Sequence, residues 1–157
     1  MTEALALALA WALHLAEAPP ALIETARLVT GDMIAMSTSR GDALLTAAVC
    51  VQESRAGLDP RALSRCGVRW RGRYVSDPAE SVRVAALSLR RWRLRCNGNA
   101  RQALTAYHLG RGCRAQDRSS YAGDVLSIEA RLRALMPLAA RAIAEATAIP
   151  PNLPPDP

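Results

Sequence analysis

Residues 43–64 read ALLTAAVCVQESRAGLDPRALS, and this stretch decides the fold. Apolar side chains recur at helical spacing from Leu44 to Val51, which predicts a buried helix. Gly57 then predicts the end of that helix and the start of a polar loop. Glu53 therefore falls where an apolar helix gives way to a loop.

The position of Glu53 allows two interpretations. A carboxylate at the end of such a helix would lie half in apolar surroundings and half in a cleft. Desolvation there disfavours the charged form, so the side chain would hold a proton near neutral pH. A general acid for glycosidic cleavage needs that property. The alternative is a solvated carboxylate in the last turn of a helix, with no chemical role.

Length and composition predict one mainly α domain. The chain has 157 residues, close to the usual size of a single domain, and half of them are apolar. Alanine and leucine dominate, which favours helices over strands. We expect the domain to cover residues 1–148. The last residues, 149–157, read IPPNLPPDP and predict an extended tail.

The elements can be predicted in outline. An apolar run at 4–13 is too short to span a bilayer and follows Glu3 rather than a basic start. We therefore predict an extra N-terminal helix over about residues 3–18 instead of a membrane segment or a secretory signal. The other expected elements are helices over 21–36, from Pro78 after an Asp77 N-cap, over 100–108 and from about 120, with a small β-ribbon near 68–75.

Charge is concentrated in the middle of the chain. Residues 61–118 hold fourteen arginines against three acids, a net +11, whereas the whole chain carries +6. An arginine-rich surface attracts anionic polymers at long range. Bacterial cell wall and nucleic acid both qualify, and a solvated surface without a specific partner is the alternative.

Four cysteines, at positions 50, 66, 96 and 113, have no CxxC spacing, so we expect no structural zinc site and no other metal or cofactor. Cys50 lies on the apolar helix and is predicted to be a small buried core residue. One disulfide among the other three would pin loops together, as suits a protein working outside the cytoplasm. Cys96–Cys113 is the preferred pair, although the spacing does not assign it.

Three segments resemble motifs of one enzyme family. Glu53-Ser54, followed by Asp59-Pro60 and by Ala62 and Ser64, resembles the "ES…P.A.S" motif of lytic transglycosylases and their goose-type lysozyme relatives. ALTAYHLGRG at 103–112 resembles their "AL.AYNAG.G" segment, and SSYAGDVL at 119–126 resembles the later "Y...V" motif. The order and rough spacing of these segments agree across about residues 40–135.

The resemblance implies a lysozyme-like fold and a specific reaction. Glu53 matches the family's catalytic acid, which protonates the oxygen between N-acetylmuramic acid and N-acetylglucosamine. The deprotonated carboxylate then helps the muramic acid 6-hydroxyl attack its own anomeric carbon, giving a 1,6-anhydro sugar. Ordinary glycosidases need a second carboxylate, whereas this route needs none. Asp59 is the nearest second acid, but Pro60 beside it suggests a turn.

The same resemblance suggests substrate-binding residues. Tyr107 and Tyr121 match family tyrosines, and the Tyr107 hydroxyl would bond Glu53 or a sugar. Ser64 matches a substrate-contacting serine. His108 replaces the family's asparagine and would donate to an acetamido carbonyl. For each of these four residues a purely structural role is the alternative.

One departure concerns the loop after Ser64. The family's "GA.GLMQ" segment is replaced by RCGVRWRGRYV at 65–75, which lacks the glutamine. Substrate binding on that side must therefore be rebuilt, and Trp70, Arg71 or Tyr74 offer aromatic faces and guanidinium donors for sugars and carboxylates.

These observations lead us to expect a peptidoglycan lytic transglycosylase that acts at the bacterial wall or periplasm. Without a standard export signal it would be carried by a virion, a secretion apparatus or a lysis pore. The alternatives are lysozyme-type hydrolysis and a non-catalytic wall-binding or structural component of a phage tail or secretion machine. A nucleic-acid-binding protein is a third reading, suggested by the charge alone and not expected, because no helix-turn-helix pattern is evident.

Overall fold

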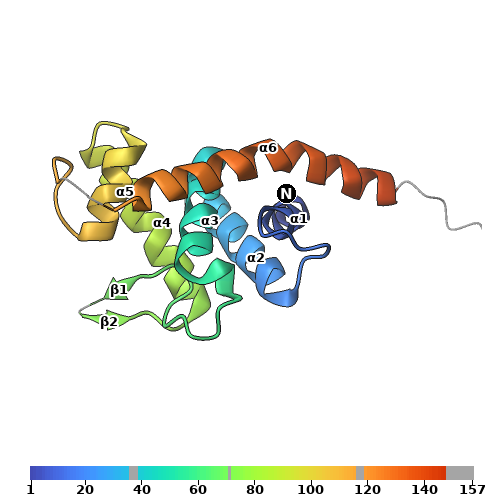
Figure 1. Cartoon of the computed structure of the whole chain (residues 1–157), viewed down its shortest axis with the longest axis horizontal. Coiled ribbons are helices and arrows are strands. Elements are labelled where there is room, and N and C mark those ends of the chain that lie inside the picture. Colours follow the sequence, from blue (N-terminus) through green and yellow to red (C-terminus); the bar gives the residue numbers. More distant parts are fainter. Residues whose placement is uncertain (36–38, 71, 116–118, 148–157) are drawn as a thin grey trace, which may run out of the picture.

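The computed structural model describes residues 1–35, 39–70, 72–115 and 119–147. Within these ranges the chain is mainly helical, as predicted, with a short 3-10 helix and one two-stranded hairpin (Figure 1). The elements are α1 (Thr2–Ala12), α2 (Pro20–Ala35), α3 (Arg40–Ser54), η1 (Arg55–Gly57), β1 (Arg69–Trp70), β2 (Arg73–Tyr74), α4 (Pro78–Arg95), α5 (Ala100–Leu109) and α6 (Tyr121–Thr147).

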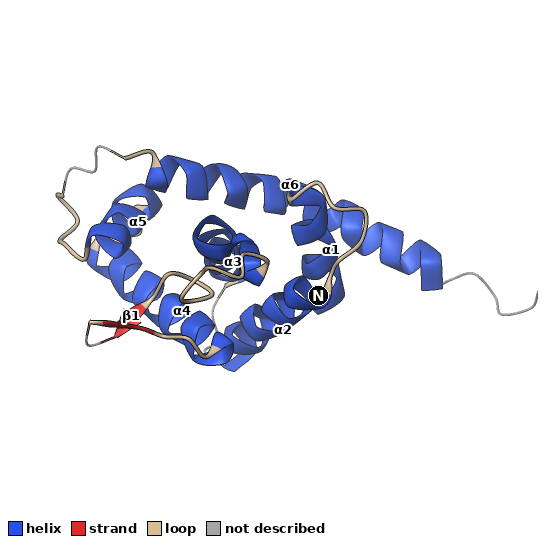
Figure 2. Ribbon diagram, turned by 60° about the horizontal axis from the view of Figure 1, so that its bottom comes forward, coloured by secondary structure: helices blue, strands red, loops and turns tan. Residues whose placement is uncertain are grey.

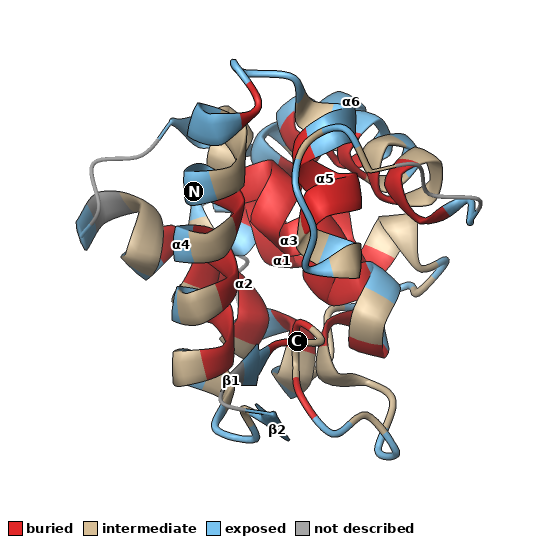
Figure 3. Ribbon diagram, turned by 90° about the vertical axis from the view of Figure 1, so that its left-hand side faces the viewer, coloured by how far each residue is buried: buried red, intermediate tan, exposed pale blue. Residues whose placement is uncertain are grey.

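Helix α3 is the centre of the molecule, with α2, α4 and α6 packed against it (Figure 2). Every residue from Ala43 to Val51 is buried, because a helix that is apolar on all sides can only be stable when it is surrounded. Ser39 and Asp42 form a capping box at its first turn. Buried residues gather on the inner faces of the helices around α3 (Figure 3).

Helix α1 packs on α6 and α2. It ends at Ala12, so the prediction of a helix over 3–18 is wrong beyond that residue. The chain turns there because His14 adopts a φ of 60°. The N–H of Leu15 then donates a hydrogen bond to the carbonyl of Ala10. Among the described residues we find no helix both long and apolar enough to cross a bilayer.

The local signals before α4 behave as predicted. Asp77 caps the helix by accepting a 2.7 Å hydrogen bond from the N–H of Glu80, and Pro78 takes the first helical position. The ribbon predicted near 68–75 is the antiparallel β1–β2 hairpin. Helix α6 continues through Pro137. The tail predicted at 149–157 lies outside the described residues.

Two disulfides hold the loops. Cys96–Cys113 is the pair preferred from the sequence, and it is present. Cys50 is fully buried as predicted, but it is bonded to Cys66, so its interpretation as an unpaired core residue is wrong. The reason is tertiary: the loop after η1 folds back over the last turn of α3, and no local pattern reveals that contact.

Candidate active site

A cleft of about 530 Å³ opens at the C-terminal end of α3. It is lined by side chains and backbone from α3, the hairpin region, α4 and α5. These residues are Glu53, Gly67, Val68, Arg69, Tyr74, Ser88, Trp92, Tyr107, His108, Leu109 and Gly110. Among these lining residues Glu53 is the one carboxylate. The sequence-based prediction that Glu53 ends a buried helix is confirmed.

The backbone just after Glu53 is strained. Arg55 and Ala56 have φ angles of 51° and 57°, in the left-handed region that non-glycine residues avoid. Ser54 is buried and accepts a hydrogen bond from the N–H of Gly57, and Thr25 donates to the Ala56 carbonyl at 2.8 Å. Such strain persists only where surrounding contacts enforce it. These contacts fix how the chain leaves α3 directly behind Glu53.

Gly67 lies directly against the Glu53 side chain. Its φ is 67°, and a Cβ at this position would lie 2.3 Å from both Cδ and Oε2 of Glu53. Any larger residue here would push the Glu53 carboxylate out of its place, and only glycine adopts this φ without strain. Its neighbour Cys66 is bonded to Cys50, which lies one turn before Glu53 on α3. The disulfide therefore ties the loop that carries Gly67 to the helix that carries the acid.

Ser64 lies beneath this loop and is absent from the residues lining the cleft. It is buried, and its Oγ accepts a 3.1 Å hydrogen bond from the N–H of Val68 and lies 2.8 Å from Oγ of Ser81. Ser81 in turn accepts from the N–H of Cys66. Ser64 therefore shapes the loop and does not line the cleft.

Tyr107 also holds the loop. Its hydroxyl donates a 2.9 Å hydrogen bond to the carbonyl of Cys66, not to Glu53. Burial, followed by the negative charge of Glu53, raises the pKa of Tyr107 above its ordinary value. The side chain is therefore a neutral phenol that can donate but does not ionise at physiological pH.

Tyr121 and His108 form a stacked pair, with ring centroids 4.1 Å apart and an interplanar angle of 14°. Tyr121 is buried and His108 is exposed in the cleft. The Tyr121 hydroxyl has no hydrogen bond of ordinary geometry in the described part of the chain. Burial raises the pKa of Tyr121, and the nearby Glu53 carboxylate raises it further. The stack thus brings two predicted residues next to the acid.

The remaining wall comes from the hairpin and α4. Tyr74 lines the cleft, whereas the side chain of Trp70 and all of Arg71, the other two predicted candidates, lie outside what the structure describes. Trp92 of α4 also lines it, and the same side chain packs against the buried cluster of Cys96, Ala103 and Ala106. Sequence reasoning missed Gly67, whose only signal was a glycine in a loop recast from the family pattern.

Asp59, the nearest second acid in sequence, points elsewhere. It borders a different groove and accepts a 3.0 Å hydrogen bond from the N–H of Arg61. That backbone N–H holds the pKa of Asp59 below its ordinary value. The turn expected from Asp59-Pro60 is therefore present, and this carboxylate is not in position to act together with Glu53.

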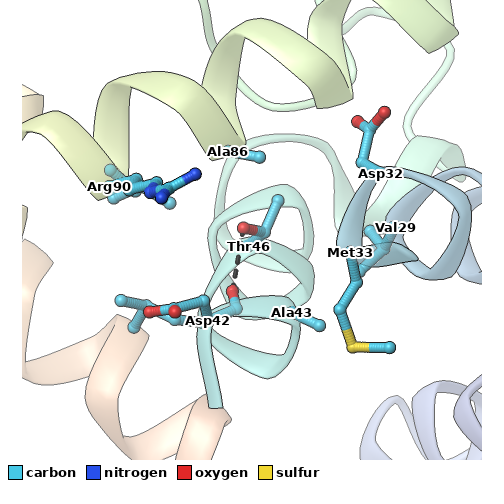
Figure 4. Close-up of a pocket in the computed structure, with 10 residues that line it drawn as sticks. Val29, Asp32, Met33, Asp42, Ala43, Thr46, Ala86 and Arg90 are labelled. Carbon is cyan, nitrogen blue, oxygen red and sulfur yellow. Dashed lines mark hydrogen bonds between the residues drawn. The ribbon is translucent and has the colours of Figure 1, made fainter. Parts of the chain in front are cut away.

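A second, much smaller pocket lies between α2, α3 and α4 (Figure 4). Its volume of about 10 Å³ is roughly that of one water, far too small for a sugar. Asp32, Asp42 and Arg90 are the charged residues on its wall, and Thr46 donates to the Asp42 carbonyl beside it.

No family model, curated protein or solved structure matches this chain.

Proposed function

We propose that this protein is a peptidoglycan lytic transglycosylase with Glu53 as its single general acid and base. The proposal rests on the motif resemblance and on one structural observation. Glu53 is packed against Gly67 at the base of a cleft of about 530 Å³, with no second carboxylate among the described lining residues. A cleft of this size accommodates a few sugar rings.

The number of carboxylates separates the possible reactions. Retaining and inverting glycosidases position two carboxyl groups across the scissile bond. Because Glu53 is the only carboxylate among the described residues that line this cleft, the arrangement favours a reaction in which the substrate supplies the nucleophile. Intramolecular attack by the muramic acid 6-hydroxyl meets this requirement, which is why we place it ahead of lysozyme-type hydrolysis.

In the proposed reaction, protonated Glu53 gives its proton to the bridging oxygen as the bond from that oxygen to the muramic acid anomeric carbon breaks. The N-acetylglucosamine product leaves with a new hydroxyl. Oxygen O6 of the same muramic acid then bonds to the anomeric carbon, and its proton passes to the Glu53 carboxylate. The acid is restored, and no water is consumed.

The two tyrosines would support this cycle as neutral donors. Their raised pKa values keep them protonated, so they add no negative charge beside the carboxylate. The Tyr121 hydroxyl, which makes no hydrogen bond of ordinary geometry within the described chain, can stabilise the ionised form of Glu53 between the two proton transfers. His108, exposed above Tyr121, is placed to donate to an acetamido group of the strand.

The test compares the protein with its Glu53→Gln variant on purified peptidoglycan, with mass spectrometry of the released fragments. Anhydro products, one water lighter than hydrolysis products and absent with the variant, are expected. Reducing-end products that depend on Glu53 would instead establish a lysozyme. If neither protein releases fragments while both are folded and bind the wall, the enzyme proposal fails and a wall-binding role replaces it.

A further inference from the structure

Two arginine–aromatic pairs lie at the cleft or directly beside it. On the hairpin, the Arg69 guanidinium lies 4.3 Å from the ring centroid of Tyr74, and its Nη2 donates to the Tyr74 hydroxyl at 2.7 Å. On α4, the Arg95 guanidinium lies 5.4 Å from the ring of Trp92. Tyr74, Arg69 and Trp92 all line the cleft.

Arg95 is exposed and is not itself a lining residue, but it lies beside the cleft through its contact with Trp92. Ser88, Trp92 and Arg95 are spaced i, i+4 and i+7 on α4, so they share one face. Ser88 and Trp92 line the cleft, and that face is therefore the cleft face.

Neither arginine is neutralised within the described chain. Six ion pairs join described residues, and they involve other arginines. A guanidinium stacked on a ring keeps the N–H groups at its edge available and is held in one orientation, which suits bidentate contact with a carboxylate. Arg69 and Arg95 thus offer two oriented sets of guanidinium N–H donors at or beside the cleft.

We propose that Arg69 and Arg95 form an anion-recognition pair that binds carboxylates carried by the glycan strand, so that the cleft selects an acidic strand over a neutral one of the same backbone. This inference rests on the proposed function, because it takes the occupant of the cleft to be a glycan. Tyr74 and Trp92 serve twice: they hold the guanidinium groups and offer ring faces to the sugars.

The test uses peptide-free glycan strands of uniform length, whose lactyl carboxylates are either left intact or converted to methylamides. Binding is measured with the Glu53→Gln variant, which leaves the strands uncut. We expect the acidic strands to bind about tenfold more tightly than the amidated strands. Adding Arg69→Gln or Arg95→Gln should each weaken binding of the acidic strands about threefold to fivefold and leave the amidated strands unaffected.

Arg27→Gln is the matched control, because Arg27 is an exposed arginine on α2 that lines no part of the cleft. Equal affinity for the acidic and the amidated strands would overturn the inference. A loss of affinity for the acidic strands in Arg27→Gln as large as that in Arg69→Gln or Arg95→Gln would also overturn it. So would tighter binding of a single-stranded DNA oligonucleotide with the same dependence on Arg69 and Arg95. Cleavage of peptidoglycan by the unmodified protein is scored separately: cleavage without charge preference refutes the inference alone, whereas absence of cleavage refutes the proposed function.

Discussion

Two half-buried carboxylates near helix ends differ in one decisive respect. Glu53 ends α3, and Asp32 lies in the last turns of α2. Neither forms an ion pair within the described residues. Glu53 opens onto about 530 Å³ beside a glycine and two tyrosines, whereas Asp32 borders about 10 Å³. Partial burial is therefore common to both acids. The large cleft and the tyrosine hydroxyls beside Glu53 are what make it, and not Asp32, a candidate catalytic residue.

The largest effect is expected from Gly67→Ala, which attacks the Glu53 region directly. The new Cβ would meet Glu53 at 2.3 Å, and the left-handed φ would be strained by about 1–2 kcal/mol. Displacing a catalytic group by an ångström lowers rates by about a hundredfold. We expect release of peptidoglycan fragments to fall by at least about that factor.

Gly98→Ala is the control for this variant. Gly98 also has a positive φ, of 80°, but the space around its Cβ position is open. Gly98→Ala should show the same loss in the free energy of unfolding with activity retained. Similar activities for the two variants would show that the contact between Gly67 and Glu53 is unimportant.

The two disulfides are expected to differ in their effect on activity but not on stability. Cys50–Cys66 and Cys96–Cys113 close loops of nearly equal length, with separations of 16 and 17, so each should stabilise the fold by about 3 kcal/mol. Replacing either pair with alanines should lower the urea midpoint to a similar extent. Only loss of Cys50–Cys66 should also abolish activity under conditions where the protein is still folded, because this bond ties the Gly67 loop to α3. If the two disulfide variants retained equal activities, the Cys50–Cys66 bond would not be needed to hold the Gly67 loop against α3.

The sequence predicted the helical class, the position of Glu53 and the Asp77 cap, because each depends on local periodicity or capping. It did not predict the Cys50–Cys66 bond or the role of Gly67, which arise where a loop returns over α3. It also did not predict that Trp92 lines the cleft, for a related reason. A helical pattern separates apolar from polar positions, but it does not show that part of the boundary faces a cleft.

The two tyrosines beside Glu53 should respond differently to removal of their hydroxyls. Tyr107→Phe leaves the Cys66 carbonyl without its donor and should lower the free energy of unfolding by about 1–2 kcal/mol. Tyr121→Phe removes a buried hydroxyl that has no protein partner of ordinary geometry, so stability should be unchanged or slightly higher. Urea unfolding of both variants measures this difference. A larger loss for Tyr121→Phe would show that its hydroxyl is already bonded to Glu53.

The smallest effect is expected at Asp32. Burial raises its pKa above the ordinary 3.8, opposed in part by Arg83. The folded state therefore holds the proton more tightly than the unfolded state, and this group destabilises the fold increasingly as pH rises through that range. Asp32→Asn removes the charge and should raise the melting temperature slightly at pH 7. The gain should vanish near pH 3, where both states of the parent protein bind the proton.

Asp59→Asn provides the opposite sign in the same experiment. The backbone N–H of Arg61 lowers the pKa of Asp59, so its ionised form stabilises the fold above the ordinary pKa, and that contribution is lost as pH falls. This variant should melt at a slightly lower temperature than the parent at pH 7 and approach it in acid. If Asp32→Asn instead behaved like Asp59→Asn, the Asp32 carboxylate would be engaged by a favourable partner. The difference in the size of the neighbouring space would then no longer explain why Glu53, and not Asp32, is the candidate catalytic acid.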